Sequence, residues 1–141
     1  MYTQKVLDIF KNPTNAGSLQ GANGVGKVGN AACGDIMKIY LKINEDEVIE
    51  QAKFKTFGCA AAIASTDVAC DMIKGMTIEE ALKVTNSQVI DELGGLPPVK
   101  IHCSILAEEA IHAAIDDYYK RKARLEKKKD ADLDDLEEDE D

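Results

Sequence analysis

The fold is decided by residues 37–43, which read Met-Lys-Ile-Tyr-Leu-Lys-Ile. Apolar side chains occupy every second position, which is the period of a strand with one buried face. Residues 44–47 (Asn-Glu-Asp-Glu) have the composition of a turn, and residues 48–57 carry Val48, Ala52 and Phe54 on one face of a second strand. Because the connection is short, we expect the two strands to pair antiparallel.

Around this hairpin, apolar residues recur three and four positions apart, which is typical of helices. A capping box at Thr77–Glu80 opens one of them, and Gly75 ends the helix before it. The expected helices cover residues 3–10, 60–74, 77–83, 88–93 and 104–122. Residues 15–30 hold five of the ten glycines and are expected to be irregular. This order predicts an α+β domain, in which a small antiparallel sheet of about three strands packs against several helices, the last of them long.

Charge divides the chain into a body and a tail. Residues 130–141 contain nine carboxylates and no base, which accounts for the whole net charge of −9. We therefore expect residues 1–122 to form the folded domain and residues 123–141 to form a charged, disordered acidic tail. The basic cluster at residues 120–129 lies beside that tail and lacks interleaved aromatic residues, so a nucleic-acid partner is not expected.

Neither a membrane span nor a signal peptide is expected from the sequence. No run of ~18 apolar residues is present, and the first residues lack the continuous apolar core of a signal peptide. A cytoplasmic location is therefore expected, and four cysteines in a reducing compartment indicate metal or redox chemistry before disulfides.

Three of the cysteines lie at the edges of expected elements. Cys33 is two residues before Asp35, and in an extended chain the two side chains point the same way. Cys59 and Cys103 are expected at helix N-termini, where the helix dipole favours the thiolate that binds metal. Cys70 lies eleven residues beyond Cys59 in one expected helix, or ~16 Å along its axis, and is interpreted as a core residue.

From the residues alone, a metal site and a reactive-sulfur site stay open alternatives. His102, next to Cys103, is a candidate ligand or a support for one, whereas His112 is interpreted as a surface or interface residue. The cysteine spacing is not that of a zinc ribbon, and three unrelated structural cysteines remain a further alternative. The glycine pattern at residues 24–29 lacks the strand and helix that a dinucleotide site requires.

Four segments of the sequence resemble the IscU/NifU-type iron–sulfur cluster scaffold family. The resemblance runs from the first helix to about Tyr119 and implies an IscU-like fold. Its motifs are Ala-Cys-Gly-Asp at residues 32–35, Phe-Lys-Thr-Phe-Gly-Cys at 54–59, Ala-Ile-Ala-Ser at 62–65, and Leu-Pro-Pro-Val-Lys-Ile-His-Cys-Ser at 96–104.

The resemblance implies a scaffold without turnover of its own. Such a scaffold accepts sulfur, as persulfide, from a cysteine desulfurase, receives iron and electrons from donor proteins, and passes a 2Fe–2S cluster to recipient apoproteins. A 4Fe–4S product would require two subunits, hence a homo-oligomer. The cluster ligands implied are Cys33, Cys59 and Cys103, together with Asp35 and His102.

Individual roles are also implied by the resemblance. Asp35 keeps the cluster labile, Cys103 is the persulfide acceptor, and zinc can occupy the same site. The segment Leu96-Pro97-Pro98-Val99-Lys100 is implied as the binding site of Hsp70/J-type chaperones, and its two prolines are expected to hold it extended.

The sequence departs from the family pattern at several places. Ala31 stands where a proline is usual, and Ala60-Ala61 replaces Gly-Ser; the acidic tail belongs to no pattern of the family. An alternative function is that of a SufU-like zinc-dependent sulfur acceptor working with a cysteine desulfurase, but that branch lacks the segment at residues 96–100. A structural zinc domain is a third alternative, against which the glycines beside Cys33 and Cys59 argue.

Overall fold

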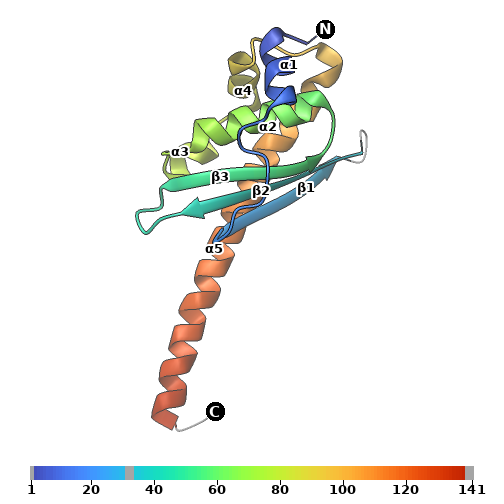
Figure 1. Cartoon of the computed structure of the whole chain (residues 1–141). Helices are drawn as coiled ribbons and strands as arrows, with labels where there is room; N and C mark the ends of the chain where they lie inside the picture. The colour runs from blue at the N-terminus through green and yellow to red at the C-terminus, as the bar shows by residue number, and fades with distance from the viewer. Residues whose placement is uncertain (1, 31–33, 139–141) are drawn as a thin grey trace.

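The computed structural model describes residues 2–30 and 34–138, with side chains for all of these except Asn30, His102 and residues 128–138. Three strands come between one short helix and a series of further helices, with the longest at the C-terminal end (Figure 1). In chain order the elements are α1 (Gln4–Lys11), β1 (Gly24–Asn30), β2 (Asp35–Ile43), β3 (Ile49–Phe57), α2 (Ala60–Ile73), α3 (Ile78–Leu82), α4 (Asn86–Glu92), the 3-10 turn η1 (Pro98–Lys100) and α5 (Ile101–Glu138).

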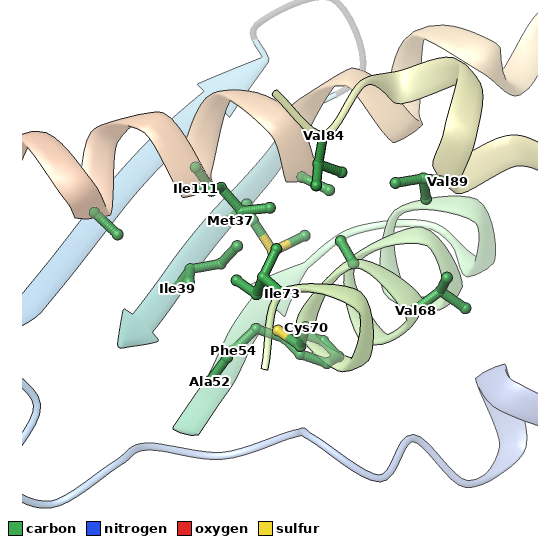
Figure 2. Packing of buried hydrophobic residues seen from close by; sticks show 14 of the residues in the cluster. Met37, Ile39, Ala52, Phe54, Val68, Cys70, Ile73, Val84, Val89 and Ile111 are labelled. Carbon is green, nitrogen blue, oxygen red and sulfur yellow. The ribbon is translucent and has the colours of Figure 1, made fainter. Parts of the chain in front are cut away.

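The strands form one antiparallel sheet in the order β1-β2-β3, which confirms the predicted fold class. Along β2 the inward side chains Met37, Ile39 and Leu41 are fully buried, as their alternation predicted. Figure 2 shows Met37 and Ile39 packed with Ile73 of α2 and Ile111 of α5. The sheet therefore has one face covered by helices. The opposite face, which we call the open face, is bordered along β3 by residues 13–17, where Ala16 forms a bridge with Phe54.

β1 is the element that the sequence analysis missed, because residues 15–30 were expected to be irregular. Gly24 and Gly26 of this strand face α5, and a Cβ on Gly26 would lie 2.3 Å from the backbone nitrogen of Ala114. The glycines let strand and helix backbones approach closely. They also remove the side chains by which a strand is recognised in a sequence.

Two helix starts differ from their expected positions. The capping box at Thr77 and Glu80 is present, but α4 begins at Asn86 behind a second box formed by Thr85 and Gln88. α5 begins at Ile101, ahead of the expected start at Ser104, because η1 leads directly into it. Only Pro97 of the proline pair keeps an extended backbone, so the expected extended segment is shorter than predicted.

α5 ends later than the sequence predicted. The helix was expected to stop near Lys122, but it runs to Glu138. Ion pairs one turn apart, Lys120–Asp116 and Arg121–Asp117, stabilise the helical path where the apolar stripe ends. The division into a domain of residues 1–122 and an acidic tail stays a prediction. None of the described helices has both the length and the apolar character needed to cross a membrane.

Candidate metal site

Asp35, Cys59 and Cys103 meet at one end of the sheet. One carboxylate oxygen and the two sulfur atoms all lie within 4.8 Å of one another, and the Sγ of Cys59 is 3.9 Å from Oδ2 of Asp35. The three residues come from the start of β2, the N-cap of α2 and the first turn of α5. Residues 68 positions apart in the sequence are thus brought within reach of a single metal ion.

The backbone beside Asp35 is shaped by two glycines. Gly34 has a φ of +71°, in the left-handed region where other residues are strained. A Cβ on Gly58 would lie 3.1 Å from Cγ of Asp35, so only glycine leaves full room for the carboxylate there. Asp35 is itself 5% exposed, on the same face of β2 as Met37. The two glycines therefore allow a buried carboxylate at the strand end.

Both cysteines are at helix N-termini, as the sequence predicted. Cys59 is the N-cap residue of α2, and Cys103 is the third residue of α5. Backbone N–H groups in the first turn of a helix favour negative charge close to them. Cys103 is fully buried whereas Cys59 is partly exposed, so the site is accessible from the side of Cys59.

Tyr2 is a neighbour of the site that sequence reasoning did not find. Burial raises the pKa of its phenol, and negative charge on Cys59 raises it further, while Lys100 lowers it. The phenol therefore lies within electrostatic range of both thiols and of the segment preceding α5. A single tyrosine at the start of the chain carried no sequence signal for this placement.

The remaining predicted residues fall into two groups. Cys33 lies outside the described residues, and so does the side chain of His102. Cys70 is fully buried in the core, as predicted, and burial raises the pKa of its thiol. His112 is exposed on α5, in agreement with its interpretation as a surface residue.

The segment implied as a chaperone site is partly accessible. Val99 is 73% exposed and Pro98 is exposed as well, whereas Leu96, Pro97 and Lys100 are partly buried. The segment immediately precedes the turn of α5 that carries Cys103. A protein bound to it would therefore act next to the metal site.

Residues 1–125 match the family model described as the NifU-like N terminal domain. The chain is 53% identical over 133 residues to the iron–sulfur cluster assembly scaffold protein IscU 1 of Archaeoglobus fulgidus, an alignment that covers 94% of this chain and 86% of the relative. It is 52% identical over 124 residues to IscU of Azotobacter vinelandii, with coverages of 86% and 96%. A crystal structure of a SUF-system assembly scaffold protein from Fervidobacterium islandicum superimposes with a TM-score of 0.66 at 26% identity, covering 80% of this chain and 95% of that one. This protein belongs to the NifU-like N-terminal domain family, and proteins named IscU are among its relatives.

Proposed function

We propose that this protein is a scaffold on which a 2Fe–2S cluster is assembled and from which it is passed to recipient apoproteins. The observation that carries the proposal is the meeting of Asp35, Cys59 and Cys103 within 4.8 Å, from three separate elements. The relatives' description as cluster assembly scaffold proteins supports it. The cluster is cargo here, and the protein completes no catalytic turnover of its own.

The ligand set suits a group that is bound and then released. Iron–sulfur clusters are held by cysteine thiolates, which Cys33, Cys59 and Cys103 supply in this proposal. Asp35, with an oxygen donor that is harder than sulfur, is the weaker ligand in such a site. His102 is proposed as an alternate ligand. Because Cys59 is partly exposed, the site itself is accessible to a recipient on that side.

Sulfur is proposed to arrive as a persulfide on a cysteine desulfurase. The thiolate of Cys103 attacks the terminal sulfur of that persulfide, a new S–S bond forms on Cys103, and the donor cysteine leaves as thiolate. Cys103 is fully buried in this structure. The transfer therefore requires the first turn of α5 to open, and Hsp70/J-type chaperones that bind at residues 96–100 are proposed to act on the same segment during release.

A zinc-dependent sulfur acceptor of the SufU type is the second candidate. The structural likeness to a SUF-system protein favours it. The segment Leu96-Pro97-Pro98-Val99-Lys100 and the higher identity to proteins named IscU favour the scaffold. Both candidates use a metal at the same ligands, so they differ in what is bound after reaction. The cytoplasm remains the proposed location.

The proposal is tested by anaerobic reconstitution with ferrous iron, cysteine and a cysteine desulfurase, followed by visible absorption and Mössbauer spectra. We expect a 2Fe–2S spectrum for the native chain and its loss in Cys33→Ala, Cys59→Ala and Cys103→Ala. Cys70→Ala, a cysteine in the core, is the matched control and retains the cluster. If the native chain forms no cluster but accepts sulfur when loaded with zinc alone, the SufU-type function replaces the scaffold.

A further inference from the structure

The open face of the sheet carries a row of three lysines. Lys27 of β1, Lys38 of β2 and Lys55 of β3 are Cα partners in the register, so they stand side by side across all three strands. Lys53 stands opposite Tyr40 in the next row. We call these four lysines the lysine face.

The lysine face has no nearby opposite charge in its own strands. The rows through Ile36, Lys38 and Tyr40 contain no carboxylate, and none of the four lysines forms an ion pair with a described residue. The ammonium of Lys38 lies 5.2 Å from the centre of the Tyr40 ring. Like charges directly opposite one another destabilise a sheet. An acidic partner bound to the lysine face would reduce this repulsion.

The lysine face borders a groove of about 610 Å³ that is also partly apolar. Ile36 and Phe57, paired in the neighbouring row, line it, and Phe57 is 81% exposed. A ligand for this surface therefore combines several carboxylates with a few apolar side chains.

The C-terminal segment of the chain has that composition. Residues 130–141 read Asp-Ala-Asp-Leu-Asp-Asp-Leu-Glu-Glu-Asp-Glu-Asp, with nine carboxylates, no base and two leucines three positions apart. No other stretch of the sequence concentrates negative charge in this way. The charges of the segment and of the lysine face are complementary.

We propose that residues 130–141 of one copy dock on the lysine face of a second copy. α5 holds the described part of that segment, residues 130–138, away from the sheet of its own chain. Lys122 reaches Glu47 beside the β2–β3 turn at 3.3 Å, and beyond it the helix continues for sixteen residues to Glu138, about 24 Å at ~1.5 Å per residue. Figure 1 shows this part of α5 projecting away from the sheet. A helix in that position can present its acidic end to another molecule.

Docking there has a consequence for the metal site. Ile36 directly follows Asp35, and Phe57 precedes Cys59 by two residues. A segment bound in the groove thus lies beside the site, and any protein that needs the same face has to displace it. The docking itself involves no metal or cluster and does not depend on the proposed function.

The location is tested on the full chain by carbodiimide cross-linking of carboxylates to lysines in an equal mixture of ¹⁴N- and ¹⁵N-labelled protein. In about 20 mM NaCl we expect cross-linked peptide pairs of mixed label that join residues 130–141 to Lys27, Lys38 or Lys55. They should be lost in about 0.5 M NaCl, because the Debye length then falls well below ~10 Å. Pairs that carry one label only would place the segment on its own sheet and overturn docking between copies.

The charge requirement is tested by sedimentation velocity with two variants that remove the same charge. K27Q/K38Q/K55Q is expected to sediment as a monomer at low salt, whereas K5Q/K11Q/K83Q, with exposed lysines outside the sheet, keeps the weight-average mass of the native chain. D132N/D134N/D135N should shift toward the monomer as well. A native chain that is monomeric at low salt, or equal masses for the two lysine variants, would overturn the proposal. If the aspartate variant still associates like the native chain, the proposal is also overturned, because something other than residues 130–141 then binds the lysine face.

Discussion

The thiols of this protein share one chemistry and differ in environment. Cys59 is partly exposed at a helix N-cap, Cys103 is buried in the first turn of α5, and Cys70 is buried in the core. Burial disfavours the charged thiolate and thereby lowers the reactivity of a cysteine. Function at this scale therefore depends on which thiol a reagent or a sulfur donor can reach.

In the native state, Cys59 should be alkylated by iodoacetamide well before Cys103, and Cys70 last. Peptide mass spectrometry over a time course measures the three rates. If the three alkylation rates are equal in the native protein and do not change when the protein is unfolded in urea, burial does not control these rates. Cys59→Ala should leave the slow rate of Cys70 unchanged, because Cys70 lies in the core and not at the site; it is the control for that rate.

The raised pKa of Cys70 predicts a dependence of stability on pH. The folded-state pKa exceeds the unfolded value of ~8.5, so the unfolded chain releases this proton first. The contribution of Cys70 is fully present below pH ~8.5 and decreases above it, by up to ~1.4 kcal/mol per pH unit. Urea unfolding of the native chain and Cys70→Ala between pH 7 and 10 measures it, and the variant should show the smaller decrease. Parallel pH curves for the two proteins would contradict the assignment.

Substitution of Asp35 tests whether a weak ligand promotes release of the cluster. Asp35→Ala should remove the weaker oxygen ligand from the site and slow transfer of the reconstituted cluster to an apo-ferredoxin, which visible circular dichroism follows. Asp91→Ala, at an exposed carboxylate of α4, is the control and should transfer at the native rate. Unchanged or faster release from Asp35→Ala would argue against its role in lability.

Among the elements, β1 depends on glycines, because their missing side chains leave room for α5. Gly24 and Gly26 lie against α5, whereas Gly29 is exposed, and a side chain there would extend from the open face of the sheet. The helix that covers β1 carries Cys103 in its first turn. The close approach of β1 and α5 therefore also positions one ligand of the metal site.

Gly26→Ala should destabilise the protein by roughly 3 kcal/mol, because its Cβ would meet the backbone of α5 and force the helix outward. Gly29→Ala lies in the same strand, but its Cβ would meet only an ordinary contact of 3.6 Å, so it should change stability by less than ~1 kcal/mol. Chemical denaturation of both variants compares them. Similar losses would show that strand propensity, and not the approach of α5, sets the requirement for glycine.

At the scale of the whole molecule, the chain consists of a packed body and a charged extension. The apolar stripe of α5 ends near Tyr118, and residues 123–127 are exposed. Lys122 still contacts the body through Glu47, whose hydrogen bond raises the pKa of the lysine. The boundary predicted at residue 122 coincides with the last charged contact that the structure describes between α5 and the β2–β3 turn.

Amide hydrogen exchange should reveal that boundary. Amides of residues 103–118 should exchange slowly because they lie under the sheet, and those of residues 123–138 should exchange orders of magnitude faster, because no apolar burial holds this part of the helix. Exchange measured by mass spectrometry at low protein concentration in about 0.5 M NaCl excludes docking between copies. Strong protection beyond residue 127 under those conditions would move the boundary toward the C-terminus.

By itself, the sequence determined the elements whose signals are local. The alternation of residues 37–43, the turn after it and the capping box at Thr77 each lie within a few neighbouring residues, so they could be recognised without a fold. The helix-edge positions of Cys59 and Cys103 and the core position of Cys70 followed from the same patterns. Only the tertiary structure decided two further features, that β1 exists and that three lysines align across the sheet, and it supplied the distances among Asp35, Cys59 and Cys103, whose shared site only the family resemblance had implied. The physical reason is that each depends on contacts between residues far apart in the chain, and in β1 the deciding residues are glycines, whose role is to leave space.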